Sequence, residues 1–132
     1  AITHYNKAIE ADKSQNNYEG LYKTLSKLGN IYLDANDFDK AEKYYHQELA
    51  AARKTEDPYL IAMSYLDLGD FYLVKKQYSK SIKAFVMAQK IIGKTISTDS
   101  KEKINRRFKY VISEIGETRF NEIIENMKRK NV

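Results

Sequence analysis

Apolar side chains recur along the chain at spacings of three and four residues, which is the period of a helix with one buried face. The clearest stripe predicts a helix over residues 18–35. Its members are Leu21, Leu25, Leu28, Ile31 and Tyr32. A similar stripe predicts a helix over residues 58–74. Asp57 followed by Pro58 is its start signal, because the first turn of a helix does not use the N–H that Pro lacks. The pattern therefore predicts an all-α protein.

Start and stop signals bound the neighbouring helices. Asp37 is placed to cap a helix over residues 38–54 through its side-chain oxygen. Gly93 is a stop signal for a helix over residues 78–92. Apolar residues at helical spacing also predict a helix over residues 1–13.

The C-terminal third has a different pattern. We expect residues 94–100 to form a polar loop in which Asp99 or Ser100 caps the following helix. An apolar stripe runs from Lys101 onward, and a second stripe follows Gly116 out of phase with the first. The slip predicts either a kink or two helices, which gives six or seven helices in all.

The chain repeats itself at an interval of 40 residues. Residues 25–32 and 65–72 both contain a Leu-Gly pair that is followed by Tyr three residues after the Gly. Residues 38–41 match residues 78–81 at the same offset. Several phrases that share one period indicate a helical-repeat architecture in which successive units stack on one another.

Two glycines of the repeat lie in the middle of predicted helices. Gly at such a position costs about 1 kcal/mol relative to Ala, so Gly29 and Gly69 require a packing reason. We expect a large side chain of the partner helix to pack over each of them. Aromatic residues of the repeat are expected to fill the space between helical hairpins, and these are Tyr32, Tyr45, Tyr72 and Phe85.

The repeat resembles the tetratricopeptide repeat family. The resemblance rests on the Leu-Gly-x-x-Tyr phrase, on a later Ala or Ser, and on an aromatic residue four positions beyond that Ala or Ser. The resemblance implies a right-handed superhelical stack of antiparallel helix hairpins. The chain departs from the family pattern at Glu48, where a small residue is usual, at Ser81, which replaces Ala, and in its period of 40 rather than 34 residues. Longer periods of this kind occur in bacterial peptide-pheromone sensors and regulator domains and in kinesin light chains.

The repeat phase divides the single expected domain into units. Residues 1–13 are the second helix of an incomplete repeat, residues 18–54 and 58–93 are repeats, and residues 98–130 form an atypical C-terminal cap. From this phase we expect the chain to be a piece of a longer protein.

Composition and charge narrow the classes of function. With 42% hydrophobic and 31% charged residues, no Cys and no apolar run near the roughly 20 residues of a membrane span, the chain is expected to be a cytoplasmic globular protein. The net charge is +5, and residues 101–132 contribute +4 of it. Nucleic-acid binding through this basic segment is therefore an alternative, although a solvated helix face explains the charge more simply. The basic residues concerned are Lys101, Lys103, Arg106, Arg107 and Lys109.

Catalytic chemistry finds no support in the sequence. The two histidines, His4 and His46, lack the spacing of metal ligands. No Gly-x-Ser-x-Gly phrase and no glycine-rich phosphate loop is present. We therefore expect neither an enzyme nor a cofactor or metal site, and interpret the chain as a binding scaffold.

The family resemblance implies that the first helix of each unit lines a concave groove. The groove candidates are the residues of those helices outside the apolar stripe, which makes them the expected peptide- or protein-binding residues. They are Lys23, Ser26, Lys27, Asn30, Asp34, Met63, Leu66, Asp67, Asp70, Lys103, Arg107 and Tyr110.

Some family members hold a peptide's C-terminal carboxylate in this groove with Lys, Asn and Arg. Here Ser26 and Asp67 stand where that clamp needs Lys and Asn, and Asp67 and Asp70 would repel a carboxylate. A peptide of mixed charge or a partner helix suits the groove better. A sensory or regulatory module of a bacterial signalling protein remains an alternative, and the apolar ends of the array are expected sites of pairing with a second copy.

Overall fold

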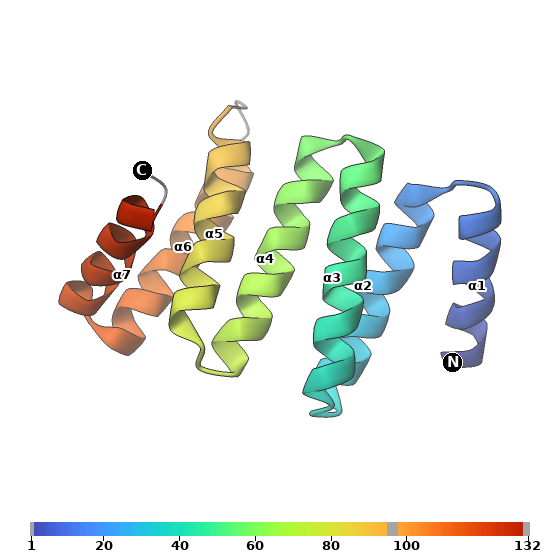
Figure 1. Ribbon diagram of the computed structural model, residues 1–132, viewed down its shortest axis with the longest axis horizontal. Helices are drawn as coiled ribbons and strands as arrows, with labels where there is room; N and C mark the ends of the chain where they lie inside the picture. The colour runs from blue at the N-terminus through green and yellow to red at the C-terminus, as the bar shows by residue number, and fades with distance from the viewer. Residues whose placement is uncertain (1, 95–97, 131–132) are drawn as a thin grey trace.

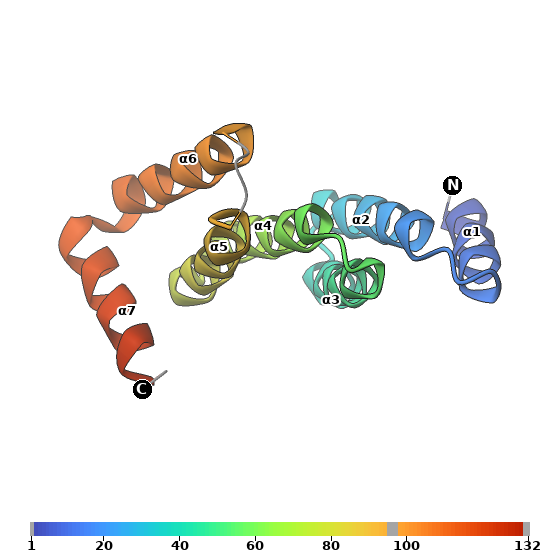
Figure 2. The same cartoon turned by 90° about the horizontal axis from the view of Figure 1, so that it is seen from above.

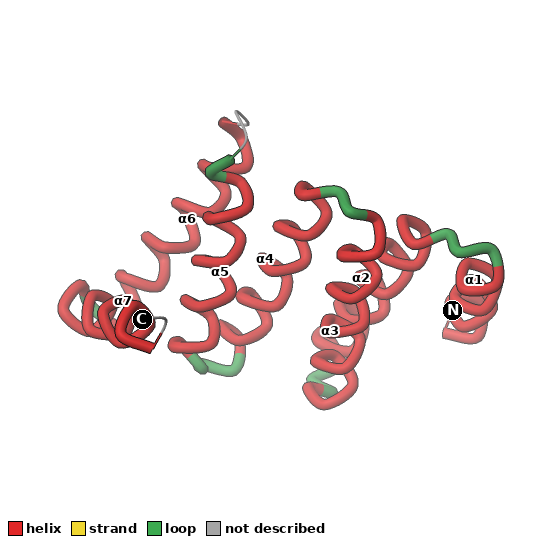
Figure 3. Tube along the Cα trace, turned by 45° about the horizontal axis from the view of Figure 1, so that its top comes forward, coloured by secondary structure: helices red, strands yellow, loops and turns green. Residues whose placement is uncertain are grey.

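The computed structural model describes residues 2–94 and 98–130, and within these ranges it contains helices joined by short loops and no strand (Figure 3). The helices are α1 (Ile2–Ser14), α2 (Tyr18–Asp34), α3 (Phe38–Thr55), α4 (Pro58–Val74), α5 (Tyr78–Ile92), α6 (Thr98–Ile115) and α7 (Glu117–Lys130). The prediction of an all-α helical-repeat protein is confirmed.

The helices stand in a row from the N-terminal to the C-terminal end (Figure 1). Helix α2 packs most closely against α3, and α4 against α5, so these pairs are the two hairpins. Seen from above, α2 and α6 lie on one side of the row, and α3 and α7 lie on the other (Figure 2). The array therefore has two faces. Side chains of α2 and α6 bond to α4 on one of them, and α5 lines hollows with α3 and with α7 on the other, so they are called here the α2–α4–α6 face and the α3–α5–α7 face.

Each hairpin closes around its mid-helix glycine. A Cβ atom at Gly29 would lie 2.6 Å from the ring of Tyr45, and one at Gly69 would collide with the ring of Phe85. Tyr45 is 1% exposed and Phe85 is 0% exposed, so neither ring has room to move away. The expectation that a large partner residue packs over each glycine is confirmed, and the rings of Tyr45 and Phe85 lie within their own hairpins rather than only between hairpins.

Aromatic contacts also join one hairpin to the next. The ring of Tyr45 lies 5.8 Å from that of Phe71 in the following hairpin. The hydroxyl of Tyr72 donates a hydrogen bond of 2.8 Å to Glu42 of α3. Phe85 in turn contacts Phe108 of α6, with ring centroids 6.1 Å apart. The core is thus continuous from α2 to α6.

The junctions of the first five helices share one backbone feature. A single residue in each junction has a φ angle of 54–59°, in the left-handed region, and these residues are Asn16, Asn36, Glu56 and Lys76. After α2 and α4, the residue that follows the left-handed one donates its backbone N–H to a carbonyl in the last turn of the helix. Asp37 donates to Tyr32, and Gln77 donates to Tyr72. These bonds satisfy carbonyls that the helix end leaves free.

The C-terminal region consists of two helices rather than one kinked helix. Gly116 separates α6 from α7 with a φ of +87°, which a residue without a side chain adopts at little cost. The predicted loop over residues 94–100 is partly wrong, because α6 already begins at Thr98 and Ser100 is buried. Residues 95–97 of that loop lie outside the described residues.

No helix in the described ranges is both long and apolar enough to cross a bilayer.

Candidate binding face on the first helices

An acidic cluster lies at the middle of the α2–α4–α6 face. Ser26 of α2 donates a hydrogen bond of 3.4 Å to Asp67 of α4. Glu48 of α3 approaches Asp67 from the core side, close enough for the charge of Asp67 to raise the pKa of Glu48. Glu48 is 0% exposed, whereas Asp67 is only partly covered. The face thus presents one carboxyl group that is backed by a second, buried one.

The two carboxyl groups hold a proton at neutral pH. Burial, followed by the charge and hydrogen bond of Asp67, raises the pKa of Glu48 to about 10. Burial also raises the pKa of Asp67, although its hydrogen bonds to Glu48 and Ser26 lower it. When both groups are ionised, neither Glu48 oxygen has a donor among the described residues. A proton on Glu48 supplies the missing donor, since two like charges so close cannot both ionise.

A second polar link joins the last repeat to α6. The guanidinium of Arg107 donates two hydrogen bonds to the carboxylate of Asp70, at 2.8 and 2.9 Å. Asp70 and Arg107 were both predicted as groove residues, and the structure pairs them with each other. Asp70 is therefore neutralised within the chain, which leaves Asp67 as the acidic group that a partner would meet on α4.

The predicted residues of α2 lie along one exposed edge of the face. Lys27 and Asp34 are exposed, and Lys23 is exposed with Glu19 at 3.5 Å. Asn30 accepts a hydrogen bond of 2.5 Å from the hydroxyl of Tyr45. These side chains can contact a partner without any change in the core.

Three further predicted residues lie at different depths. Leu66 is 2% exposed and packs in the core, so its placement on the binding face is wrong. Met63 is half-buried against the same core, whereas Tyr110 is 52% exposed. Other helices cover α4 on more than one side. Residues of α4 that lie outside its apolar stripe are therefore not all exposed to solvent.

The basic residues of α6 do not form one common surface for nucleic acid. Arg107 is bound to Asp70, and Arg106 lies 3.8 Å from Glu102 in the same helix. Lys103 is exposed beside the α2–α4–α6 face. This distribution gives the nucleic-acid alternative no support.

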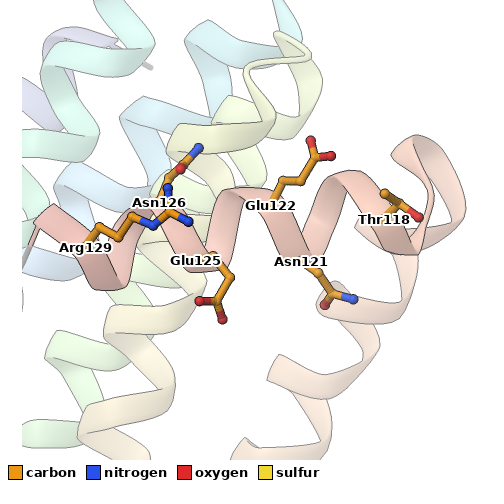
Figure 4. Close-up of a pocket in the computed structure, with 6 residues that line it drawn as sticks. All are labelled: Thr118, Asn121, Glu122, Glu125, Asn126 and Arg129. Atoms are coloured by element: carbon orange, nitrogen blue, oxygen red, sulfur yellow. The ribbon is translucent and has the colours of Figure 1, made fainter.

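No group of three or more potential metal-ligating side chains occurs in the described ranges 2–94 and 98–130. His46 lies 3.6 Å from Glu42 and 3.4 Å from the Tyr72 hydroxyl, which makes it part of a polar contact between α3 and α4. A hollow on α7 is lined by Thr118, Asn121, Glu122, Glu125, Asn126 and Arg129 (Figure 4). All six side chains come from this one helix, so the hollow has no second wall that could enclose a ligand.

Two features of the structure have signals in the sequence that the spacing of apolar residues does not explain. Glu48 stands inside the apolar stripe of α3, next to Leu49, where a charged residue is unexpected. The stretch from Phe71 to Thr98 contains six lysines and no Asp or Glu. The first signal points to the buried carboxyl pair, and the second points to the opposite face of the molecule.

The paired helices, the glycine-centred hairpins and the open polar face define a helical-repeat scaffold. The sequence profile of the tetratricopeptide repeat family matches residues 20–92, more than half of the chain. The chain therefore belongs to the tetratricopeptide repeat family, whose members generally serve as protein-interaction scaffolds rather than as enzymes. The comparison with curated protein sequences gives no significant match.

Proposed function

We propose that this chain is a non-enzymatic scaffold that binds a peptide or protein segment along the α2–α4–α6 face. The observation that carries the proposal is Asp67, a partly exposed carboxyl group at the middle of a face built on rigid helices. Asp67 lies on a helix, and its side chain contacts Ser26 and Glu48, so it needs little rearrangement on binding. The proposed contact residues are those predicted for the groove, without Leu66.

Charge indicates the kind of segment that fits. The centre of the face carries Asp67, with Asp34 on the neighbouring helix, and Lys27 and Lys103 lie exposed on α2 and α6. A segment with a basic residue near its middle and acidic residues toward its ends complements this arrangement. A segment that ends in a carboxylate at Asp67 would be repelled.

A charge swap on α2 tests the face without a change in net charge. Lys27→Glu combined with Asp34→Lys exchanges two exposed side chains that lie two helical turns apart. Random short peptides are selected by phage display against the chain, and their affinities for the wild type and the variant are then compared. We expect the selected peptides to bind the variant at least about tenfold more weakly, which corresponds to about 1.4 kcal/mol.

A matched swap on α1, Lys7→Glu with Glu10→Lys, is the control, because both side chains are exposed and lie away from the proposed face. If the selected peptides bind all three proteins equally, the α2–α4–α6 face is not the binding surface. If selection enriches no peptide at all, the scaffold does not bind short segments.

A second candidate function is that of a sensory or regulatory module in a bacterial signalling protein. The repeat interval of 40 residues is compatible with it, because longer periods of this kind occur in bacterial peptide-pheromone sensors and regulator domains as well as in kinesin light chains. The coding sequence on both sides of this segment tests the idea. A neighbouring DNA-binding or kinase-control domain would support it, whereas neighbours of unrelated type would contradict it.

A further inference from the structure

The α3–α5–α7 face carries a lysine-rich ridge along α5. Lys80, Lys83 and Lys90 are exposed and follow one another at spacings of three and seven residues, so they lie on the same side of the helix. Lys130 of α7 joins them across a hollow. No carboxylate among the described residues lies within ion-pair distance of these four lysines.

Two apolar hollows flank this ridge. The first, of about 360 Å³, lies between α3 and α5 and is floored by Leu68 and Tyr72 of α4. The second, of about 270 Å³, lies between α5 and α7 and is lined by Val86 and Met127. Met87 lines both hollows, so they meet at the ridge of α5. Figure 1 looks onto this face and shows α5 between α4 and α7.

The rim of the hollows is basic and the floor is apolar. Among the described residues that line them, the charged ones are lysines, with His46 at the edge of the first hollow and no Asp or Glu. Lys80 already lies over the ring of Tyr72, 5.5 Å from its centroid. Lysines without a carboxylate partner around an apolar floor favour a ligand with two kinds of side chain. Its acidic side chains pair with the lysines, and its apolar side chains enter the hollows.

We propose that this face binds an acidic amphipathic protein segment, which places apolar side chains in the two hollows and its carboxylates on the lysines of the ridge. The site is separate from the α2–α4–α6 face. One scaffold therefore holds a segment of mixed charge on one side and an acidic segment on the other.

An anionic membrane is a poorer occupant of this face. The large apolar side chains that protrude from the described surface are Ile2, Tyr59, Val74 and Tyr110, and none of them lines either hollow. The apolar atoms here lie at the bottom of hollows walled by neighbouring helices. A flat bilayer does not reach them, whereas a side chain of a bound segment does.

Lys80→Glu combined with Lys83→Glu is the decisive variant. Both residues are exposed, and Lys80 lies in the first turn of α5, where a negative charge interacts favourably with the helix dipole, so the variant is expected to fold. The same phage library is selected against the wild type, and the clones are sorted by their loss of affinity for the variant. We expect a class of clones that loses at least about tenfold and is enriched in Asp and Glu together with Leu, Met or Phe.

The control is Lys101→Glu with Lys109→Glu on α6, which makes the same change in net charge at two exposed positions. Equal losses in the two variants would mean general charge attraction and would overturn the proposal. So would the absence of any clone that responds to the α5 variant.

Two further measurements identify other occupants. Sedimentation with phosphatidylglycerol vesicles, compared with phosphatidylcholine vesicles, would reveal a membrane surface if the α5 variant abolished binding. Light scattering would reveal self-association if the wild type were a dimer and the variant a monomer. Either result would assign the face to that occupant and overturn the proposal. The charge swap on α2 leaves this site intact, so each variant reports on its own face.

Discussion

At the scale of single residues, the mid-helix glycines determine how closely the two helices of a hairpin approach. The ring of Phe85 occupies the place that a side chain at position 69 would take, and it is fully buried. Because Ala is the better helix former by about 1 kcal/mol, any loss of stability on substitution reports packing rather than helix propensity.

Gly69→Ala is expected to lower the free energy of unfolding by about 1–3 kcal/mol, the usual cost of overpacking a core. Urea denaturation followed by circular dichroism measures it. In a Phe85→Leu background the smaller side chain makes room, and the cost of Gly69→Ala should shrink. A rise in stability for Gly69→Ala alone would show that the ring moves aside freely.

The buried carboxyl pair makes stability depend on pH. Glu48 has a pKa of about 10 in the folded protein and an ordinary value of 4.5 when exposed. The folded state therefore retains a proton that the unfolded chain releases, so this contribution to stability is fully present below pH 4.5 and is lost as the pH rises through the folded pKa.

Glu48→Gln should remove this dependence, because its amide donates to Asp67 at every pH. We expect the variant to exceed the wild type in stability by about 1 kcal/mol or more at about pH 9, and the difference to shrink toward about pH 5. Urea titrations at the two pH values measure it. A difference that does not change with pH would mean that Glu48 titrates normally.

At the scale of the helices, side-chain caps mark where α2, α3 and α4 begin. Asp37 and Asp57 accept hydrogen bonds from Lys40 and Tyr59 at the starts of α3 and α4. Gln77 occupies the equivalent position before α5, with φ −93° and ψ 75° against −89° and 79° at Asp37, but makes no side-chain cap. The start of α5 therefore lacks the side-chain cap that α3 has, although the backbone conformation at the two positions is nearly the same.

Gln77→Asp should restore that cap and raise the free energy of unfolding by about 1 kcal/mol. Thermal or urea denaturation measures the gain. Asp37→Gln at the matching position is the reciprocal control and should cost a similar amount. The idea is contradicted if Gln77→Asp leaves stability unchanged while Asp37→Gln lowers it.

Element bounds could be predicted wherever the sequence carries local signals. The bounds of α4 and α5 agree with the prediction, in which Asp57 and Pro58 mark the start of α4 and Gly93 marks the end of α5. The start of α6 at Thr98 was placed three residues too late, since polar Ser and Thr suit a loop as well as a first turn. At Gly116 the phase slip indicated a break, but only its φ of +87° distinguishes two helices from a kink.

At the scale of the whole molecule, contacts between distant residues decide which predicted site residues are available. Asp70 and Arg107 are 37 positions apart, and nothing local in the sequence pairs them. Leu66 was placed on the binding face because it lies outside one apolar stripe, yet α4 is enclosed by helices on several sides. The repeat pattern thus predicted the family and the hairpins, whereas the chemistry of the site depended on the tertiary structure.

The Asp70–Arg107 pair should help to hold α6 and α7 on the last repeat. Both side chains are partly exposed, so we expect a coupling energy of only about 1 kcal/mol from a double-mutant cycle of Asp70→Ala and Arg107→Ala. Urea denaturation of the four proteins measures it, and added salt should weaken it. Strictly additive losses would show that the pair contributes nothing.

The left-handed junction residues Asn16, Asn36, Glu56 and Lys76 occur at intervals of 20 positions. The four junctions from α1 to α5 therefore place a left-handed residue at the same position of each 20-residue step. Genetic duplication of a 40-residue block would extend the row by one hairpin and leave its neighbours undisturbed, whereas an insertion of another length would rotate every later helix. A 40-residue block is thus the unit by which such an array would lengthen.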